Sequence, residues 1–433
     1  MSSSFHVRAF GAVGNGTVKD TTAIQAAIDA CHAAGGGRVV FEKGIYLAAP
    51  FFLKSNVELH LEKGAVILGS ADVDDYFEWH SAGMNPEAAV YNTRALLIAD
   101  KAENIAITGE GSIEGNSAPY YDRSNPDAPF WPVRDKKTRP GRMLWLILCR
   151  NVRIEDVTLN DAPAWTIWMA GCERVRIRNV NIRTQWQAIN TDGIDVDSCR
   201  DVEIRHCTID TGDDCIVLRA IDRFLEKPKP CEQVLVENCT LRSHCNAIRL
   251  SYVRDGVIRN AVFRNITIQN SRRGVICQVP SPMETPEKDS NIPVVPGPMI
   301  ENISFANLRI EAEQPLWFVL SDTGCARGFS NFRFENIAAV GCRPSVFKGN
   351  AETSIKNLLF RNVELTLRDG PVTYSHYRAA EEKAAALSLV HCNNAVLENF
   401  IMQGDNPQNM AELPLLHVEG TNKIGRASCR ERV

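Results

Sequence analysis

One short pattern recurs along most of this chain and restricts the folds open to it. A polar residue, often asparagine, is followed by alternating apolar and polar residues, as in Asn151-Val-Arg-Ile-Glu-Asp-Val and Asn302-Ile-Ser-Phe-Ala-Asn-Leu. Alternation with a period of two indicates a β-strand with one buried face. Recurrence every ~20–40 residues indicates a stack of similar coils.

The repeat predicts an all-β fold, a right-handed parallel β-helix (a solenoid). Long helices are missing between the repeats, which argues against alternating strand–helix units. Coils are expected about 4.8 Å apart, with aliphatic side chains, thiols and asparagines in internal ladders. We expect one domain over residues 1–422, with an N-terminal cap at 5–54 and coils at 55–422.

The cap is predicted to contain one short helix. Asp20 is expected to cap it, the helix continues to about Ala34, Gly35-Gly36-Gly37 ends it, and a strand follows at Arg38–Phe41. Such a helix covers the open end of a solenoid core. At the other end, residues 423–433 break the repeat and resemble an in-frame translation of a sequencing adapter, so we expect them to be foreign.

Cysteines follow the repeat. Four of the 14 lie three residues before a repeat valine: Cys149, Cys172, Cys199 and Cys231. A repeat register favours stacked buried thiols over a disulfide framework. No close Cys-x-x-Cys pair or histidine partner supports a metal site, and no metal or other cofactor is expected.

Charge and hydropathy exclude several classes of partner. The 433 residues carry a formal charge of −4 with a pI near 6.2, which predicts no nucleic-acid partner. No apolar run approaches the ~20 residues of a membrane span, so no membrane partner is expected. The first residues lack the pattern of a signal peptide, which predicts a cytoplasmic location.

Uneven spacing of the repeat places insertions in four stretches: Pro119–Pro140, Phe224–Pro230, Pro280–Pro298 and Asp369–Ala386. Proline-rich insertions are often linkers. On one side of a solenoid, however, they can form the walls of a groove.

Aspartates concentrate between residues 190 and 219. Asp192 and Asp213 are 213 − 192 = 21 residues apart, close to one coil, so we expect them at equivalent positions on adjacent coils with Asp214 beside them. Neighbouring carboxylates repel one another, which favours displaced pKa values and acid–base roles, although a solvated ladder of turn residues is the alternative. Asp195 and Asp197 are interpreted as turn or supporting residues.

The segments Asn190-Thr-Asp-Gly-Ile-Asp and Gly212-Asp-Asp, at this spacing, resemble glycoside hydrolase family 28, the polygalacturonase family. The N-terminal Phe10-Gly-Ala-Val-Gly and Leu53-Lys-Ser-Asn-Val-Glu-Leu are similar to the same family, and the likeness covers residues 5 to about 400. The resemblance implies an inverting glycosidase. Asp213 would be the general acid, and Asp192 and Asp214 would hold and deprotonate the attacking water.

Two further motifs of that family have diverged in this chain. The Gly-His-Gly element corresponds to Ser243-His244-Cys245, which makes His244 a candidate partner of the catalytic carboxylates, with a structural turn histidine as the alternative. The Arg-Ile-Lys element, which grips the substrate carboxylate, corresponds to Ile276-Cys277-Gln278, where both basic residues are gone. A uronate substrate normally pairs with a cation. We expect substrate contacts from Asn190, Arg219, Arg249 and Gln278, with Arg272 and Arg273 as further candidates.

The expected partner is therefore a pectin-like polysaccharide or oligosaccharide, and insertions that close the groove predict exo action. Two other functions remain open. A β-helix polysaccharide lyase would eliminate instead of hydrolysing, usually with Ca²⁺ and a basic residue. A non-catalytic carbohydrate-binding β-helix would use the same coils without turnover.

Overall fold

The computed structural model describes residues 3–86, 92–221, 224–252, 255–279, 297–320, 326–370, 385–404 and 416–421, and the backbone of 424–426 and 429–432. The chain divides into two compact units, each described by itself. The N-terminal unit comprises Met1–Ile216 and Arg223–Lys229, and the C-terminal unit comprises Val217–Asp222 and Pro230–Val433. The expected single domain stays a prediction.

The N-terminal unit consists of three parallel sheets, and most coils contribute one strand to each sheet in turn. The first sheet contains β1 (Ser4–His6), β3 (Gly37–Phe41), β6 (Val57–Leu61), β9 (Glu103–Thr108), β12 (Arg150–Glu155), β15 (Glu173–Arg178) and β18 (Arg200–Arg205). The second contains β2 (Asn15–Lys19), β4 (Gly44–Ala48), β7 (Ala65–Gly69), β10 (Ser112–Glu114), β13 (Thr158–Asn160), β16 (Asn181–Arg183) and β19 (Thr208–Thr211). The third contains β5 (Phe51–Phe52), β8 (Ala95–Asp100), β11 (Arg142–Ile147), β14 (Trp165–Ala170) and β17 (Ile194–Asp197).

Alternation along each strand directs the apolar side chains inward. In β6, for example, Val57, Leu59 and Leu61 are fully buried while the residues between them are partly exposed. Since equivalent residues are paired in register from coil to coil, the apolar side chains stack into continuous ladders. The predicted all-β parallel β-helix with an N-terminal helical cap is confirmed.

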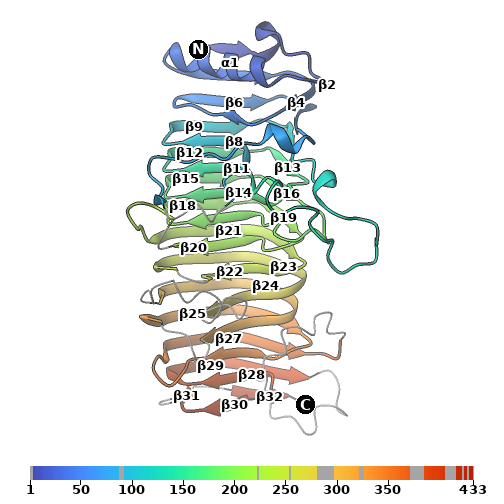
Figure 1. The fold of residues 1–433 in the computed structure, drawn as a ribbon. Helices are drawn as coiled ribbons and strands as arrows, with labels where there is room; N and C mark the ends of the chain where they lie inside the picture. Colours follow the sequence, from blue (N-terminus) through green and yellow to red (C-terminus); the bar gives the residue numbers. More distant parts are fainter. Residues whose placement is uncertain are drawn as a thin grey trace. The chain divides into compact units, whose positions relative to one another are not determined.

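Helix α1 (Thr21–Ala33) lies at the N-terminal end of the N-terminal unit (Figure 1). It covers the first coil, where it packs against β1, β3 and β5. Its buried face includes Ile24, Ile28 and Cys31. The predicted boundary at Asp20 is confirmed, but the predicted capping hydrogen bond is wrong. The Asp20 carboxylate instead accepts the main-chain N–H groups of Val13 (2.6 Å) and Gly14 (2.9 Å) and so holds the turn before β2. Short 3-10 helices are η1 (Val7–Phe10), η2 (Val73–Asp75) and η4 (Ala118–Tyr120).

The predicted thiol ladder is present inside the N-terminal unit. Cys149, Cys172 and Cys199 are fully buried free thiols. Each Sγ donates to a carbonyl of the preceding coil, those of Ala99 (3.2 Å), Leu146 (3.4 Å) and Met169 (3.4 Å). Burial raises the pKa of Cys172 well above its usual range, and hydrogen bonding to Cys172 together with burial raises that of Cys149. Cys149 and Cys172 therefore stay protonated, and all three buried thiols act as packing groups.

The C-terminal unit continues the pattern with longer strands that run through the corner between two sheets. The long strands are β21 (Cys231–Ser243), β23 (Val257–Val279), β24 (Met299–Leu320), β25 (Gly328–Gly341), β27 (Ile355–Leu367) and β29 (Cys392–Gly404). The shorter strands are β22 (Asn246–Leu250), β26 (Ser345–Lys348), β28 (Leu387–Val390), β30 (Leu416–Glu419), β31 (Ile424–Arg426) and β32 (Cys429–Arg432). In sequence, β20 (Ile216–Arg219) precedes β21 at the change from one unit to the next.

The asparagines lie on the surface at the coil corners, so their expected internal location is wrong. Each adopts the left-handed conformation that bends the chain, with φ near 56° at Asn336 and 57° at Asn307. Their amides form exposed ladders, in which Asn336 Nδ2 donates to Asn307 Oδ1 and Asn362 Nδ2 donates to Asn336 Oδ1, both at 2.9 Å. Water and neighbouring amides satisfy these polar groups, whereas the apolar interior offers neither.

Phenylalanines take the inward position after the corner in the C-terminal unit. Phe263, Phe305, Phe334 and Phe360 stack with ring centroids 5.1, 5.0 and 5.1 Å apart. All four are fully buried. The ladder is one continuous core that spans four coils of this unit.

The predicted insertions fall partly within the described residues. Phe224, from the stretch Phe224–Pro230, packs on Trp168 with ring centroids 4.5 Å apart, so it acts as a covering segment of the N-terminal unit. Most of Pro280–Pro298 and of Asp369–Ala386 lies outside the described residues. β31 and β32 pair with β29, so the described backbone of the last residues extends the stack. The foreign origin expected for residues 423–433 stays a prediction. Among the described helices, none combines the length and apolar character needed to cross a membrane.

Candidate active site

The three candidate aspartates lie in the turns that lead from the second sheet to the third. Asp192 follows β16 on one coil, and Asp213 and Asp214 follow β19 on the next. Asp192 and Asp214 are buried, with 6% and 3% of their surface exposed, while Asp213 is half-buried. The fold thus brings together the carboxylates that the motifs predicted.

Backbone hydrogen bonding sets the register between these two turns. In the parallel sheets of this unit, a main-chain N–H donates to the carbonyl of the residue just before its paired residue on the next coil. Ile167, for example, is paired with Ile194, and its N–H donates to Gly193 O. The Gly193 N–H donates to Asp214 O at 2.8 Å, so Asp192 lies beside Asp214, 214 − 192 = 22 residues away. The expected equivalence of Asp192 and Asp213 is therefore wrong by one residue. The residue paired with Asp192 is Asp214, and Asp213 comes one position before it.

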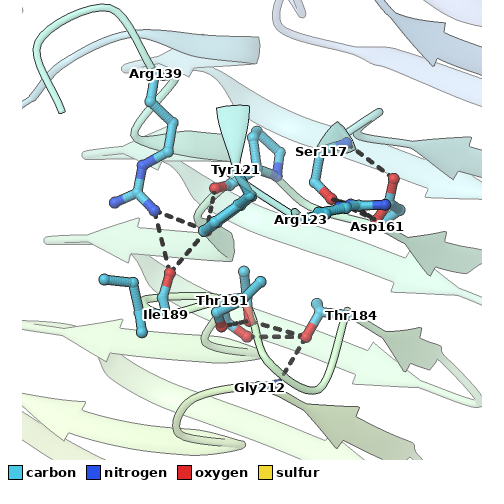
Figure 2. Close-up of polar contacts among 11 residues, drawn as sticks. Ser117, Tyr121, Arg123, Arg139, Asp161, Thr184, Ile189, Thr191 and Gly212 are labelled. Atoms are coloured by element: carbon cyan, nitrogen blue, oxygen red, sulfur yellow. Dashed lines mark hydrogen bonds and ion pairs between the residues drawn. The ribbon is translucent and has the colours of Figure 1, made fainter. Parts of the chain in front are cut away.

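A chain of hydrogen bonds locks the two turns together (Figure 2). The Gly212 N–H donates to Thr184 Oγ1 (3.0 Å), which lies 3.1 Å from Thr191 Oγ1, and the Thr191 hydroxyl donates to Ala188 O (2.7 Å). A Cβ added at Gly212 would lie 2.3 Å from the carbonyl oxygen of Gln185 and 2.4 Å from that of Ala188. The motif needs glycine here because the preceding coil's loop lies directly on it.

Asn190 connects this loop to Asp213. Its backbone has φ near 59°, and its N–H donates to Asp213 Oδ2 at 2.8 Å. Its side-chain Oδ1 accepts from Arg139 Nη2 at 3.2 Å. The predicted substrate contact Asn190 is thus also a structural ligand of the predicted acid.

Arg139 and Tyr121 reach this corner from the insertion at Pro119–Pro140 (Figure 2). Arg139 Nη1 donates to Tyr121 Oη (2.7 Å) and to Ile189 O (3.1 Å). Tyr121 Oη lies 2.8 Å from both Ile189 O and Pro163 O. Neither residue was identified from the sequence, and the only signal was the aromatic and proline-rich composition of the insertion.

Burial raises the pKa of Tyr121 to about 12; Arg139 opposes the rise, and the charges of Asp213 and Asp192 add to it. The phenol therefore stays neutral at ordinary pH and remains a hydrogen-bond donor. The two aspartates lie within electrostatic reach of its oxygen. The corner is consequently a compact electrostatic unit of one guanidinium, one phenol and nearby carboxylates.

The insertion has its own small apolar core. Tyr120, Tyr121 and Trp131 pack on Ala188 and Ile189 of the loop before Asn190. The Arg123 guanidinium lies over the Trp131 ring, 4.6 Å from the centroid. The insertion is therefore packed onto the loop that carries Asn190, which argues against a linker.

Asp195 and Asp197 belong to strand β17, so their interpretation as turn residues is wrong. Both are almost completely buried, at 1% and 0% exposure. The Ser198 hydroxyl donates to Asp197 Oδ1 at 2.9 Å. Both lie in the third sheet, on the strand that directly follows the turn carrying Asp192.

Several predicted substrate contacts belong to the C-terminal unit. Arg219 Nε lies 3.3 Å from both carboxylate oxygens of Asp255, whose side chain is fully buried. Tyr252 donates its N–H to Asp255 Oδ2 (2.7 Å), and its ring lies under Arg219 and Arg249 at 5.1 and 4.9 Å. Arg219 is thus engaged by a buried carboxylate, and substrate contacts from Arg219 and Arg249 stay predictions.

The other candidate site residues of the C-terminal unit lie at different places in it. His244 is half-buried in the turn between β21 and β22, and Gln278 is half-buried on β23. Arg273, buried on β23, donates to Gln314 Oε1 (3.3 Å) and Asn246 Oδ1 (3.5 Å). Arg272 is buried beside it. Their functional roles stay predictions.

A groove of about 420 Å³ lies elsewhere in the C-terminal unit, along the corner asparagines Asn307, Asn336 and Asn362. Its charged lining residues are Arg309 and Glu364. It contains no set of close carboxylates, and we do not place the chemistry there.

The segment that contains the three aspartates is similar to a known family. The sequence model of glycosyl hydrolases family 28 matches residues 86–226, which include all three aspartates. A probable polygalacturonase of Vitis vinifera is 28% identical over 279 residues, covering 61% of this chain and 55% of the relative. An exo-poly-alpha-D-galacturonosidase of Dickeya chrysanthemi is 26% identical over 306 residues, covering 61% and 50%. The chain spans about half the length of these curated relatives.

Solved structures agree on the fold. The family 28 exopolygalacturonase of Yersinia enterocolitica superposes with a TM-score of 0.67 at 20% identity, covering 98% of this chain and 78% of that one. A hyperthermoactive exopolygalacturonase of Thermotoga maritima superposes with a TM-score of 0.65 at 23% identity, covering 85% and 87%. At these identities the likeness concerns the fold alone.

Proposed function

We propose that this chain, whose residues 86–226 match the sequence model of glycosyl hydrolases family 28, hydrolyses glycosidic bonds of a pectin-like polysaccharide or oligosaccharide with inversion of configuration. The observation that carries the proposal is the grouping of Asp192, Asp213 and Asp214 on adjacent coils of one rigid turn assembly. Like charges this close are costly to a fold that does not use them.

Asp213 is the proposed general acid. It is the half-buried member of the group, and Asn190 N–H holds its Oδ2 at 2.8 Å. An oxygen that accepts an N–H does not carry the transferable proton, so the proton resides on Oδ1. From Oδ1 the proton passes to the leaving glycosidic oxygen.

Asp192 and Asp214 form the proposed base side. They lie side by side on adjacent coils and are both buried. A water held between two carboxylates loses its proton to one of them as it attacks the anomeric carbon. Inverting glycosidases separate acid and base by ~6.5–9.5 Å, which leaves room for this water.

The proposed substrate is a pectic glycan because two relatives are named for galacturonide hydrolysis. At the position where the resemblance implies a basic residue, this chain has Ile276, which packs in an apolar cluster with Trp317, Val319 and Val346. An apolar side chain provides no partner for a uronate carboxylate. Substrate screening therefore has to include neutral and esterified pectic oligosaccharides beside free galacturonides.

The test is incubation of the purified full chain with such oligosaccharides of defined length. Reducing ends and mass spectrometry report cleavage, and ¹H NMR of the first product reports its anomeric configuration. We expect addition of water with inverted configuration, and Asp213→Asn as the inactive control. Release from one chain end indicates exo action, and a random product ladder indicates endo action.

Two results would overturn the proposal. An unsaturated, ultraviolet-absorbing product that a chelator abolishes would identify a lyase. Glycan binding without turnover, equal in the wild type and in Asp213→Asn, would identify a carbohydrate-binding protein.

A further inference from the structure

We infer that Arg139 is a positioning residue for hydrolysis, acting through the Ile189–Asn190 corner on the carboxylate of Asp213. This inference rests on the proposed function for its kinetic readout. Its structural readout is independent of any activity.

The first observation is where Arg139 lies and what it contacts. It belongs to the insertion, not to a coil, and only 8% of its surface is exposed. Its main-chain carbonyl accepts from Asn92 Nδ2 at 2.7 Å, which ties the end of the insertion to the body of the unit. From this anchor the guanidinium reaches the corner and donates to Ile189 O (3.1 Å) and Asn190 Oδ1 (3.2 Å).

The second observation is the conformation of the corner. Asn190 has φ near 59°, a region that costs a non-glycine residue roughly 1 kcal/mol and persists where the surroundings hold it. Arg139 binds the corner on both sides of one peptide, through Ile189 O and through the Asn190 side chain. Tyr121 Oη adds a contact to Ile189 O at 2.8 Å.

The third observation connects the corner to the chemistry. The N–H of Asn190 is the donor to Asp213 Oδ2 at 2.8 Å, and its direction depends on the peptide that Arg139 holds. If the corner relaxes, that oxygen loses its donor and the proton is no longer confined to the oxygen facing the leaving group. The Arg139 guanidinium donates hydrogen bonds to Tyr121, Ile189 and Asn190, so its effect on Asp213 is indirect.

The kinetic experiment compares Arg139→Ala with the wild type on the best substrate of the screen. We expect kcat to fall about 10–100-fold with KM within about two-fold, since groups that orient a reacting residue typically contribute this much. Guanidinium chloride at millimolar concentration should restore part of kcat in Arg139→Ala. Arg139→Lys, with one charged nitrogen in place of the fork, should be intermediate.

Arg134→Ala is the matched control. Arg134 lies in the same insertion and donates to the main-chain O of Tyr121 at 3.0 Å, without reaching the Ile189–Asn190 corner. Its removal perturbs the insertion alone, and we expect kcat within about two-fold of the wild type, as for surface substitutions generally.

The structural experiment is amide hydrogen exchange over residues 185–191, at a pH where all variants are folded. We expect Arg139→Ala to exchange faster than both wild type and Arg134→Ala, because the Asn190 N–H is no longer held in line with its acceptor, Asp213 Oδ2. Unchanged exchange in Arg139→Ala would overturn the inference. So would unchanged kcat in an active protein, or a rise in KM alone, which would make Arg139 a substrate ligand. A wild type without hydrolysis refutes the proposed function, and exchange then decides the positioning role by itself.

Discussion

Asp192 lies beside Asp214 on the adjacent coil, because the N–H of Gly193 donates to Asp214 O at 2.8 Å. The buried pair thus comes from two different turns, and Asp213 stands next to it with its Oδ2 held by the N–H of Asn190. A carboxylate oxygen of Asp213 also lies within 4.8 Å of one of Asp214, so the three residues form one group. Half-buried Asp213 and the buried Asp192 and Asp214 have different environments, and a difference of this kind is what separate acid and base functions require.

The acid role predicts a specific loss of turnover. Asp213→Asn keeps the acceptor for the Asn190 N–H but has no transferable proton, so kcat should fall by ~10²–10⁴-fold. Reducing-end assays at saturating substrate measure the change. Asp201→Asn is the control, because Asp201 is 41% exposed on the same unit and pairs with Arg176 at 3.0 Å. Equal turnover in Asp213→Asn and Asp201→Asn would contradict the role.

The buried phenol of Tyr121 predicts a pH-dependent contribution to stability. Its folded pKa of about 12 lies above the ordinary value of 10.0. The contribution is therefore complete below pH 10 and is lost as pH rises from 10 to 12. Between pH 9 and pH 11 the wild type should lose about 1.4 kcal/mol through this residue.

The matched variant is Tyr121→Phe, which removes the titrating group and the contacts of its hydroxyl to Ile189 O and Pro163 O. Urea unfolding at pH 9 should find the variant less stable than the wild type, by about 1–3 kcal/mol for a buried oxygen left without its donor. At pH 11 the difference in stability between wild type and Tyr121→Phe should be about 1.4 kcal/mol smaller than at pH 9. A gap that is constant or wider at pH 11 would count against the buried, neutral phenol.

The surface asparagine ladder predicts that glycine destabilises these corner positions less than alanine does. Asn336 has φ near 56° and shares 2.9 Å amide hydrogen bonds with Asn307 and Asn362. Asn336→Ala loses the bonds and strains the backbone, for about 2 kcal/mol, whereas Asn336→Gly loses only the bonds, for about 1 kcal/mol. Urea midpoints rank the variants, with exposed Arg333→Ala on the same strand as the neutral reference. Alanine as stable as glycine would refute the conformational account.

The aromatic ladder predicts the largest stability effect. Phe334 is fully buried between Phe305 and Phe360, at 5.0 and 5.1 Å. Phe334→Ala leaves a cavity in a continuous stack and should cost about 3–5 kcal/mol, and Phe334→Leu about 1–2 kcal/mol. Unfolding in urea measures both. A loss below 1 kcal/mol for alanine would mean that the neighbouring rings refill the space.

Much of the fold and the candidate catalytic residues followed from local sequence. Period-two alternation, repeated at coil length, predicts stacked strands because each strand buries one face whatever its neighbours are. The thiols of Cys149, Cys172 and Cys199 were predicted inside because they keep the same place in every coil. The aspartates were predicted because Asn190-Thr-Asp and Gly212-Asp-Asp are contiguous segments whose chemistry is visible in the residues themselves.

Only the tertiary structure decided which aspartates are paired and which residues hold them in place. Asp214 replaces Asp213 as the neighbour of Asp192 because hydrogen bonds between coils, not residue counting through turns of variable length, set the register. The corner asparagines turn outward because amides find partners there and the interior offers none. Arg139 reaches Asn190 across 190 − 139 = 51 residues, from an insertion without a repeat. A contact between segments so far apart leaves no period in the sequence, and only the packed chain brings the two together.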